Sequence, residues 1–228
     1  MKPKVIVTRD IPNEVELKLK EYFQVAFNRE DKVFSNDILR KAMESADGIV
    51  CTVTDSITDE LLTLPKKKVK IIANIGVGVD HIDLQSAKEN NVIITNTPDV
   101  LTESTVDVAT LLLLSVTRNA FLVEKMLRQD EWKGFSLTEN LGVDVRGKIL
   151  GIVGMGRIGK AFAKRAHEVF GMKVLYYNRS PVKDLTFEAS VRFDLDALLE
   201  ESDVISLHLS SDKGNKNFIS KSRMKKIR

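Results

Sequence analysis

The chain has 228 residues, of which 43% are hydrophobic and 29% are charged. This composition is ordinary for a globular protein, excludes a disordered class, and allows one large domain or two modest ones. The 35 lysine and arginine residues stand against 32 aspartate and glutamate residues, so the net charge is only +3. That balance gives no reason to expect a nucleic-acid partner or a membrane surface. The single cysteine, Cys51, excludes an intrachain disulfide and a cysteine-clustered metal site, and we expect no metal.

The apolar stretches of the chain are short. Residues 5–7 cannot form the core of a signal peptide, and residues 111–114 fall far short of a membrane span. We therefore expect the protein in the cytoplasm.

Short β-branched runs alternate with amphipathic stretches over the first hundred residues. The runs at 5–7, 25–27, 49–53, 69–73 and 92–94 predict strands, and the stretches at 13–22, 36–45, 58–64 and 83–90 predict helices. Asn36 and Thr58 are the expected N-caps of two of these helices. Alternation of this kind predicts an α/β fold with a parallel sheet covered on both faces. Cys51 lies in an apolar run and is expected to be a small buried hydrophobe.

A long helix is predicted to begin near Leu101. Val106, Ala109, Leu113 and Val116 recur at helical spacing, and many residues between them are apolar too. We expect this helix to be largely buried and to form a spine between two domains.

A second strand–helix–strand unit follows the long helix. Residues 148–153 form a near-continuous apolar strand, residues 158–170 carry one apolar helical face, and residues 173–177 predict the next strand. Gly171 is expected to end the helix. These elements together predict a compact βαβ unit.

Three glycines separate the first strand of that unit from its helix. Gly154, Gly156 and Gly159 have the spacing of a dinucleotide-binding turn, in the strand-to-helix context that this motif requires. Gly154 allows the tight turn, Gly156 lets the backbone approach a diphosphate, and Gly159 lets the helix pack closely on the strand. A structural turn without a ligand and a nucleotide-binding methyltransferase are the competing interpretations.

The second strand of the unit ends in Asn178, Arg179 and Ser180, where a dinucleotide site normally has an acid for the ribose hydroxyls. The Arg179 guanidinium can pair with a 2′-phosphate, and Asn178 and Ser180 can add neutral hydrogen bonds. We therefore expect NADP(H) to be preferred over NAD(H). The alternative is that Arg179 merely caps the strand in solvent.

The chain resembles the D-isomer-specific 2-hydroxyacid dehydrogenases, and within them most closely the glyoxylate/hydroxypyruvate reductase branch. Six motifs that occur in the same order carry this resemblance. They lie at residues 74–80, 96–98, 101–103, 141–148, 154–159 and 203–209. The resemblance implies two Rossmann- or flavodoxin-like domains with the active site between them. Residues 1–100 would form the substrate-binding domain and residues 101–228 the NAD(P)-binding domain. The implied substrate is a small 2-oxo or 2-hydroxy acid.

The same resemblance assigns further residues. Val77 and Gly78 match a loop whose amides hold the substrate carboxylate, although a tight turn without a ligand would look similar. Thr105 matches a position near the nicotinamide end of the cofactor. The pyrophosphate-side and adenosine-side positions are Arg157, Ile158, Leu209 and Ser210, and the family usually has proline where this chain has Ser210.

The family's general acid is a histidine, oriented by a carboxylate and accompanied by a substrate-binding arginine. His81, His167 and His208 do not match it, with His167 expected on the exposed side of its helix. The matching Arg, Glu and His would come after residue 228, so the cofactor domain is expected to be truncated and this chain inactive by itself. The family resemblance implies a homodimer for a complete protein, with residues 121–132 as a possible surface. The alternative function is a non-catalytic NAD(P)-binding pseudoenzyme or sensor.

Overall fold

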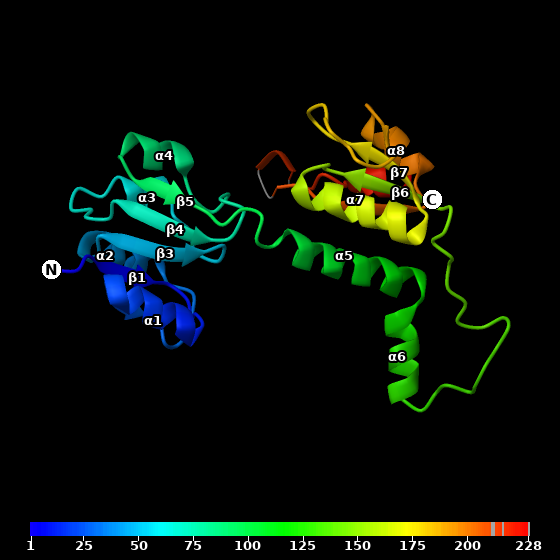
Figure 1. The fold of residues 1–228 in the computed structure, drawn as a ribbon, viewed down its shortest axis with the longest axis horizontal. Coiled ribbons are helices and arrows are strands. Elements are labelled where there is room, and N and C mark those ends of the chain that lie inside the picture. Colours follow the sequence, from blue (N-terminus) through cyan, green and yellow to red (C-terminus); the bar gives the residue numbers. More distant parts are fainter. Residues whose placement is uncertain (211–212, 216, 228) are drawn as a thin grey trace. The chain divides into compact units, whose positions relative to one another are not determined.

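The computed structural model describes residues 1–210, 213–215 and 217–227. The chain divides into two compact units, Met1–Asp99 and Val100–Arg228, which Figure 1 shows as two separate layered bodies. Each unit has a parallel sheet with helices packed on it, which confirms the predicted α/β class.

The first unit contains a five-stranded sheet in the order β2-β1-β3-β4-β5. All of its strand pairs are parallel, as the alternation of strand and helix predicts. Its strands are β1 (Lys4–Val7), β2 (Gln24–Phe27), β3 (Gly48–Thr52), β4 (Ile71–Ile75) and β5 (Ile93–Thr95), and its helices are α1 (Asn13–Tyr22), α2 (Asn36–Ser45), α3 (Asp59–Leu62) and α4 (Leu84–Glu89).

The helix caps of this unit differ in detail from the prediction. Asn36 as the N-cap of α2 is wrong, because Ser35 takes that position and its hydroxyl accepts the N–H of Ile38. Thr58 does stand at the N-cap of α3, but its side chain makes no capping bond. Each of these helices is stabilised mainly by the apolar face that it buries.

The core of the first unit lies between the sheet and α2, α3 and α4. Met43, Ile49 and Ile72 are each 1% exposed or less. Cys51 is fully buried in the same cluster, which confirms its predicted role as a core residue. Burial, with a smaller contribution from the charge of Asp55, raises the pKa of the Cys51 thiol to about 12.

The second unit contains a four-stranded parallel sheet in the order β8-β7-β6-β9. Its strands are β6 (Ile149–Val153), β7 (Lys173–Tyr177), β8 (Ser190–Val191) and β9 (Val204–Leu207). Its helices are α5 (Thr102–Thr117), α6 (Ala120–Arg128), α7 (Arg157–Phe170), α8 (Leu195–Glu201), the 3₁₀ turn η1 (Lys213–Asn215) and α9 (Lys221–Met224). Gly171 ends α7 in the left-handed conformation, as predicted. Arg228, which was expected in the last helix, lies outside the described residues.

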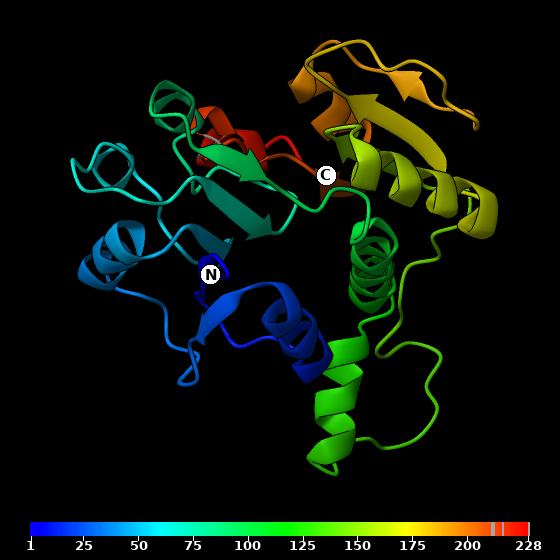
Figure 2. The ribbon, with the colours of Figure 1, turned by 60° about the vertical axis from the view of Figure 1, so that its left-hand side comes forward.

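Helix α5 is only half buried, so its prediction as a largely buried helix is wrong. Val106 and Leu113 face the core shared with α7, whereas Leu112 and Val116 are exposed. The helix belongs to the second unit and lies alongside α7 (Figure 1, Figure 2). Its apolar residues surround the helix, and among the described residues of the second unit its main packing partner is α7.

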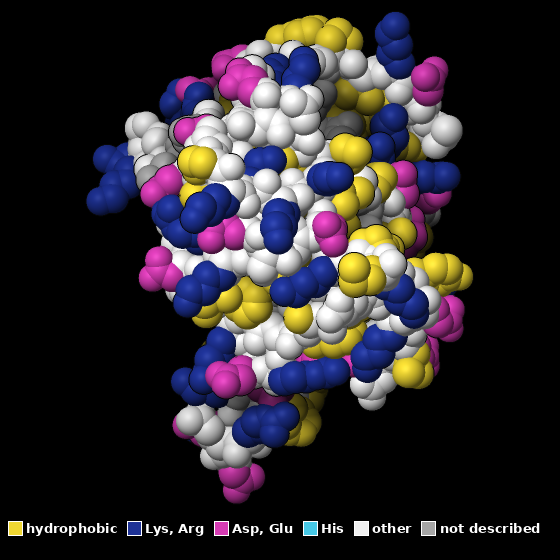
Figure 3. Space-filling view, turned by 90° about the vertical axis from the view of Figure 1, so that its left-hand side faces the viewer, with side chains coloured by type: hydrophobic (Ala, Val, Ile, Leu, Met, Phe, Trp, Pro, Cys, Tyr) yellow, Lys and Arg dark blue, Asp and Glu magenta, His cyan; other side chains and the backbone are white. Residues whose placement is uncertain are grey.

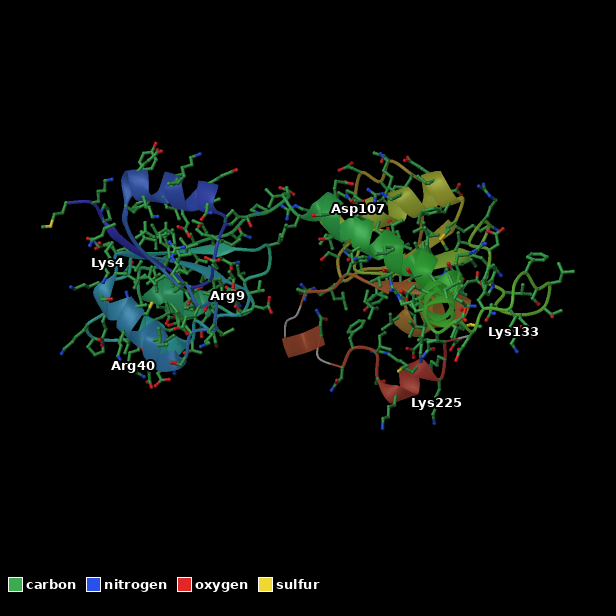
Figure 4. The ribbon with its side chains drawn as sticks, turned by 90° about the horizontal axis from the view of Figure 1, so that it is seen from below. Lys4, Arg9, Arg40, Asp107, Lys133 and Lys225 are labelled. Atoms are coloured by element: carbon green, nitrogen blue, oxygen red, sulfur yellow. The ribbon has the colours of Figure 1, made fainter. Side chains whose placement is uncertain are left out.

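Ion pairs on the surface add to the packing of α5 on α7. The Arg165 guanidinium of α7 bonds to Glu103 at 2.8 Å and also to Asp107, whose position in α5 Figure 4 shows. Both carboxylates lie in the first half of α5, where an acid is also favoured by the helix dipole. Because the pairs are exposed, we expect them to contribute little to stability compared with the buried apolar contact.

Charged and hydrophobic side chains are mixed on the face of the molecule that Figure 3 shows. On the face in Figure 3, lysine and arginine side chains lie among carboxylates and hydrophobic side chains rather than in one patch. Among the described residues no single helix is long and apolar enough to cross a membrane; α5 and α6 reach that length and composition only as a pair bent by 71°.

One ion pair joins the segments that follow β1 and β2. Arg9 (Figure 4) donates through Nε and Nη2 to the two carboxylate oxygens of Asp31, at 2.7 and 3.0 Å. The N–H of Asp10 donates to the same carboxylate at 2.9 Å. The Arg9 hydrogen bonds, followed by the Asp10 N–H, lower the pKa of Asp31 from 3.8 to about 2.

This pair predicts a defined dependence of stability on pH. Because the pKa of Asp31 is lower in the folded protein, its contribution is present above its unfolded pKa and is lost as pH falls through the folded value. Asp31→Asn should lower the thermal midpoint of unfolding at neutral pH, and this difference should disappear between the two pKa values. The matched control is Glu30→Gln, in the neighbouring exposed pair with Lys32, which should change little. An equal difference at all pH values would contradict the assignment.

Candidate functional site

A pocket of about 290 Å³ lies at the carboxyl ends of β6 and β7 in the second unit. In the sheet, β6 lies between β7 and β9, so the strand order reverses at β6. Ligands of parallel α/β sheets bind at such a switch in strand order. The described residues that line the pocket are Gly154, Gly156, Tyr177, Asn178, Arg179, Ser180, His208, Leu209, Ser210, Asn215 and Phe218.

The glycine turn is shaped by close backbone contacts. Gly154 has a φ of +96°, and a Cβ at this residue would lie 2.4 Å from the carbonyl oxygen of His208. A Cβ at Gly159 would lie 2.1 Å from the carbonyl oxygen of Gly154. Gly156, in contrast, has no atom within 4 Å of the place where its Cβ would be. Gly154 and Gly159 are therefore required by the fold. Gly156 instead faces open space at the pocket, where a diphosphate can approach the backbone.

The turn leads directly into α7, with Gly156 as its N-cap. The start of a helix has unpaired N–H groups and a positive dipole end, which favour an anion. Arg157 is exposed and Ile158 packs against the core of the unit, and neither lines the pocket. Of the turn and the start of the helix, only Gly154 and Gly156 line the pocket.

The rim of the pocket carries the residues that follow β7. Arg179 and Ser180 are exposed, and Arg179 forms no hydrogen bond or ion pair with any described residue. The described lining residues include this guanidinium and no carboxylate. Asn178 also lines the pocket, but its amide bonds to the backbone of Met155 and Ser180. The rim is therefore chemically suited to an additional phosphate and unsuited to an acid-bound ribose.

The pocket is also lined by Leu209 and Ser210, as expected, and by three residues that sequence reasoning missed. These are Tyr177, Asn215 and Phe218. The Asn215 amide donates to the Ser210 carbonyl at 2.9 Å, and the rings of Tyr177 and Phe218 lie 6.4 Å apart. The sequence offers one indication of these residues: Phe218 is an aromatic residue in a segment rich in lysine and arginine.

Thr105 is not part of this pocket. Its hydroxyl donates to the Leu101 carbonyl at 2.7 Å within the first turns of α5. It lines a separate groove of about 440 Å³, together with Ser206, His208 and apolar residues of α5. The structure therefore brings together most of the predicted cofactor residues, but not Thr105.

The loop after β4 has its carbonyl groups held by side-chain amides. Asn74 is 2% exposed, and its Nδ2 donates to the carbonyls of Gly76 and Gly78 at 3.3 and 2.9 Å. Asn96 donates to the carbonyl of Val77 at 2.9 Å. The N–H groups of Val77 and Gly78 have no acceptor among the described residues. Two free amides side by side form an anion-binding arrangement, which suits a carboxylate.

His81 contacts the Asn74 side chain that holds this loop. Its Nε2 lies 3.1 Å from Oδ1 of Asn74, and since that oxygen can only accept, Nε2 carries the proton. Burial lowers the pKa of His81, against the opposing effect of Asp80 and Asp55. The neutral imidazole of His81 therefore orients the side chain of Asn74.

The other two histidines also have structural contacts. His208 has its Nε2 2.9 Å from the Ser206 hydroxyl, and burial lowers its pKa. His167 is half buried, with Nδ1 3.1 Å from the Met172 carbonyl and its ring 6.1 Å from Phe187. Its prediction as an exposed residue is wrong, because the segment after β7 folds back over α7.

Comparison with known proteins is consistent with this geometry. The sequence profile of the D-isomer specific 2-hydroxyacid dehydrogenase NAD binding domain matches residues 110–228. The chain is 39% identical over 230 residues to a glyoxylate reductase of Thermococcus litoralis, covering 99% of this chain and 69% of that protein. It is also similar to the crystal structure of the TT0316 protein from Thermus thermophilus, with a TM-score of 0.88, 37% identity, and coverage of 99% and 70%. A glyoxylate reductase structure from Paecilomyes thermophila has a TM-score of 0.84, 30% identity, and coverage of 100% and 71%.

The three glycines should respond differently to the same substitution. Gly154→Ala and Gly159→Ala should each lower the free energy of unfolding by about 2–4 kcal/mol, because a methyl group would meet a backbone carbonyl. Gly156→Ala should change stability by less than about 0.5 kcal/mol, because nothing occupies that space. The same Gly156→Ala variant should bind nicotinamide nucleotide about tenfold more weakly or worse.

Urea denaturation measures the first effect, and fluorescence titration of NADPH measures the second. Unchanged nucleotide affinity in a stable Gly156→Ala protein would contradict the placement of the diphosphate.

Proposed function

The chain belongs to the D-isomer-specific 2-hydroxyacid dehydrogenase family. We propose that it is part of an NADPH-preferring reductase of glyoxylate, hydroxypyruvate or a similar small 2-oxo acid. The glyoxylate reductases among its relatives support this substrate class. When bound, a reduced nicotinamide cofactor supplies hydride for the carbonyl carbon of such an acid. The chain's own contribution is to bind and orient the two molecules.

The observation that carries the cofactor proposal is the chemistry of the pocket rim. Arg179 is exposed beside the glycine turn, without a partner among the described residues, and the described lining residues include no carboxylate. A guanidinium can grip a phosphate through two hydrogen bonds, whereas a carboxylate would repel it. Ser180 adds a neutral hydroxyl at the same rim. This combination favours NADP(H) over NAD(H).

The substrate proposal depends on the loop after β4. The side chains of Asn74 and Asn96 bind the carbonyl groups of the loop, and the N–H groups of Val77 and Gly78 have no acceptor among the described residues. A carboxylate of a 2-oxo acid can accept both of these hydrogen bonds. The amides are fixed before the substrate arrives, so little conformational entropy is lost on binding.

None of the three histidines of this chain matches the family's proton donor. They each hold a structural contact, to Asn74, Met172 and Ser206 respectively. The family's Arg, Glu and His have no matching residues within the 228. We therefore propose that the chain by itself binds both molecules without turning them over.

The second candidate function is a non-catalytic NAD(P)-binding sensor. Such a protein would use the nucleotide pocket and would need no proton donor. A chimaera distinguishes the reductase from the sensor. In it, the part of the Thermococcus litoralis protein that this chain does not match is fused to residue 228 of this chain. Turnover by the chimaera supports the reductase, and nucleotide binding without turnover supports the sensor.

A homodimer is the proposed assembly of the complete protein. Phe121, Leu122 and Leu127 of α6, with Trp132 after it, are all exposed. Large exposed aromatic and aliphatic side chains of this kind are typical of protein interfaces.

Replacement of Arg179 tests the cofactor preference directly. Arg179→Ala should weaken NADPH binding by about 10- to 100-fold, because a charge-assisted hydrogen bond is lost, and should leave NADH binding within about twofold. The matched control is Lys183→Ala, which removes a cation from the same segment. Isothermal titration with both nucleotides measures the difference, and equal losses for NADPH and NADH would refute the preference.

Activity of the 228-residue chain is the second test. With NADPH and glyoxylate, the purified chain should show no loss of nicotinamide absorbance above the rate without protein, although it binds the nucleotide. Turnover at an ordinary enzymatic rate, typically about 1 s⁻¹ or more, would show that a proton donor exists within the chain.

A further inference from the structure

Asn178 connects two parts of the nucleotide pocket. Its Oδ1 accepts the N–H of Met155, in the glycine turn, at 2.9 Å. Its Nδ2 donates to the carbonyl of Ser180, in the rim segment, at 2.7 Å. Met155 and Asn178 are 23 residues apart in the chain, so this side chain makes a tertiary link between the turn and the rim.

The link begins where the β-sheet ladder ends. The last backbone bond between these strands runs from the N–H of Gly154 to the carbonyl of Tyr177, at 2.9 Å. Beyond it the turn and the rim segment diverge, and the Asn178 side chain replaces the missing ladder bonds. The rim segment that it holds includes Arg179 and Ser180, both of which are exposed.

The Asn178 amide can make both bonds because it carries a donor and an acceptor. A backbone N–H can only donate and a backbone carbonyl can only accept, so the orientation of the Asn178 side chain is determined by its partners. Aspartate could still accept from Met155, but could not donate to Ser180 while ionised. Alanine could do neither, and Met155, which is 3% exposed, would be left with an unpaired buried N–H.

We propose that Asn178 is a positioning residue that determines the cofactor preference by holding the 2′-phosphate rim against the diphosphate turn. Sequence reasoning assigned Asn178 a direct bond to the nucleotide, whereas here both ends of its amide already bind the backbone. This proposal rests on the proposed binding of NADPH at this pocket. It adds that Arg179 is effective only while the link holds it in place.

The consequence differs between the two cofactors. NADPH uses the diphosphate turn and the rim at once, so it gains from a rim that is ordered before binding. NADH has no 2′-phosphate and depends mainly on the turn. Loss of the link therefore falls more heavily on NADPH than on NADH.

The first measurement compares the two nucleotides in one variant. Asn178→Ala should weaken NADPH binding about tenfold and NADH binding about twofold or less, as expected when an ordered rim becomes mobile. Lys183→Ala is the matched control, because it truncates a side chain of the same segment that does not line the pocket and leaves both Asn178 bonds in place. It should leave the preference for NADPH unchanged. Equal losses for NADPH and NADH in Asn178→Ala would overturn the proposal.

A double-mutant cycle separates positioning from direct contact. In an Arg179→Ala protein, adding Asn178→Ala should weaken NADPH no more than it weakens NADH, since there is no longer a guanidinium to position. If Asn178 bonds directly to the 2′-phosphate, the selective loss of NADPH affinity should persist in that background. Persistence would overturn the positioning role.

Amide exchange of the ligand-free protein tests the link itself. Asn178→Ala should speed hydrogen exchange of the Met155 N–H at least about tenfold. Asn178→Asp keeps an acceptor for the Met155 N–H and should preserve its slow exchange. This variant also provides a test if the Asn178→Ala protein does not fold. Unchanged Met155 exchange in folded Asn178→Ala would refute the link, as would fast exchange in Asn178→Asp. A wild-type protein that binds neither nucleotide would instead refute the proposed function.

Discussion

The close approach of three backbone segments at Gly154 is the constraint on which the second unit depends. The carbonyl of Gly154 occupies the space of a side chain at Gly159, and the carbonyl of His208 occupies the space of a side chain at Gly154. Helix α7 therefore lies directly against the end of β6, and the segment after β9 closes on the turn. This packing directs the start of α7 toward the pocket and leaves Gly156 facing open space.

Asparagine side chains perform a similar task in both units. Asn74 donates to two carbonyls of the loop after β4 and accepts from His81, while Asn178 accepts from Met155 and donates to Ser180. An amide carries a donor and an acceptor a short distance apart, so it can hold irregular backbone that no helix or sheet supports. In the first unit, the N–H groups of Val77 and Gly78 in this loop have no acceptor among the described residues. In the second unit, the amide joins the glycine turn to the segment that carries Arg179.

Where the structure differs from the sequence-based expectation, the difference has an identifiable cause. Ser35 rather than Asn36 caps α2, since adjacent polar residues compete for one cap and the backbone before the helix decides between them. Val116 is exposed although it follows the apolar periodicity of α5, because periodicity shows which residues share a face but not whether another element covers that face. His167 is half buried because a segment distant from its own helix folds over it.

The sequence by itself determined the parallel α/β architecture, the glycine turn and the absence of a carboxylate from residues 178–180, which directly follow β7. These are local properties: alternation of apolar residues, glycine at backbone positions without space for a side chain, and the chemical type of three consecutive residues. Only the tertiary structure decided that Phe218 and Asn215 complete the pocket, that Thr105 lies outside it, and that Asn178 binds the backbone. The physical reason is that a side chain's partners depend on residues far away in the chain, which no local pattern identifies.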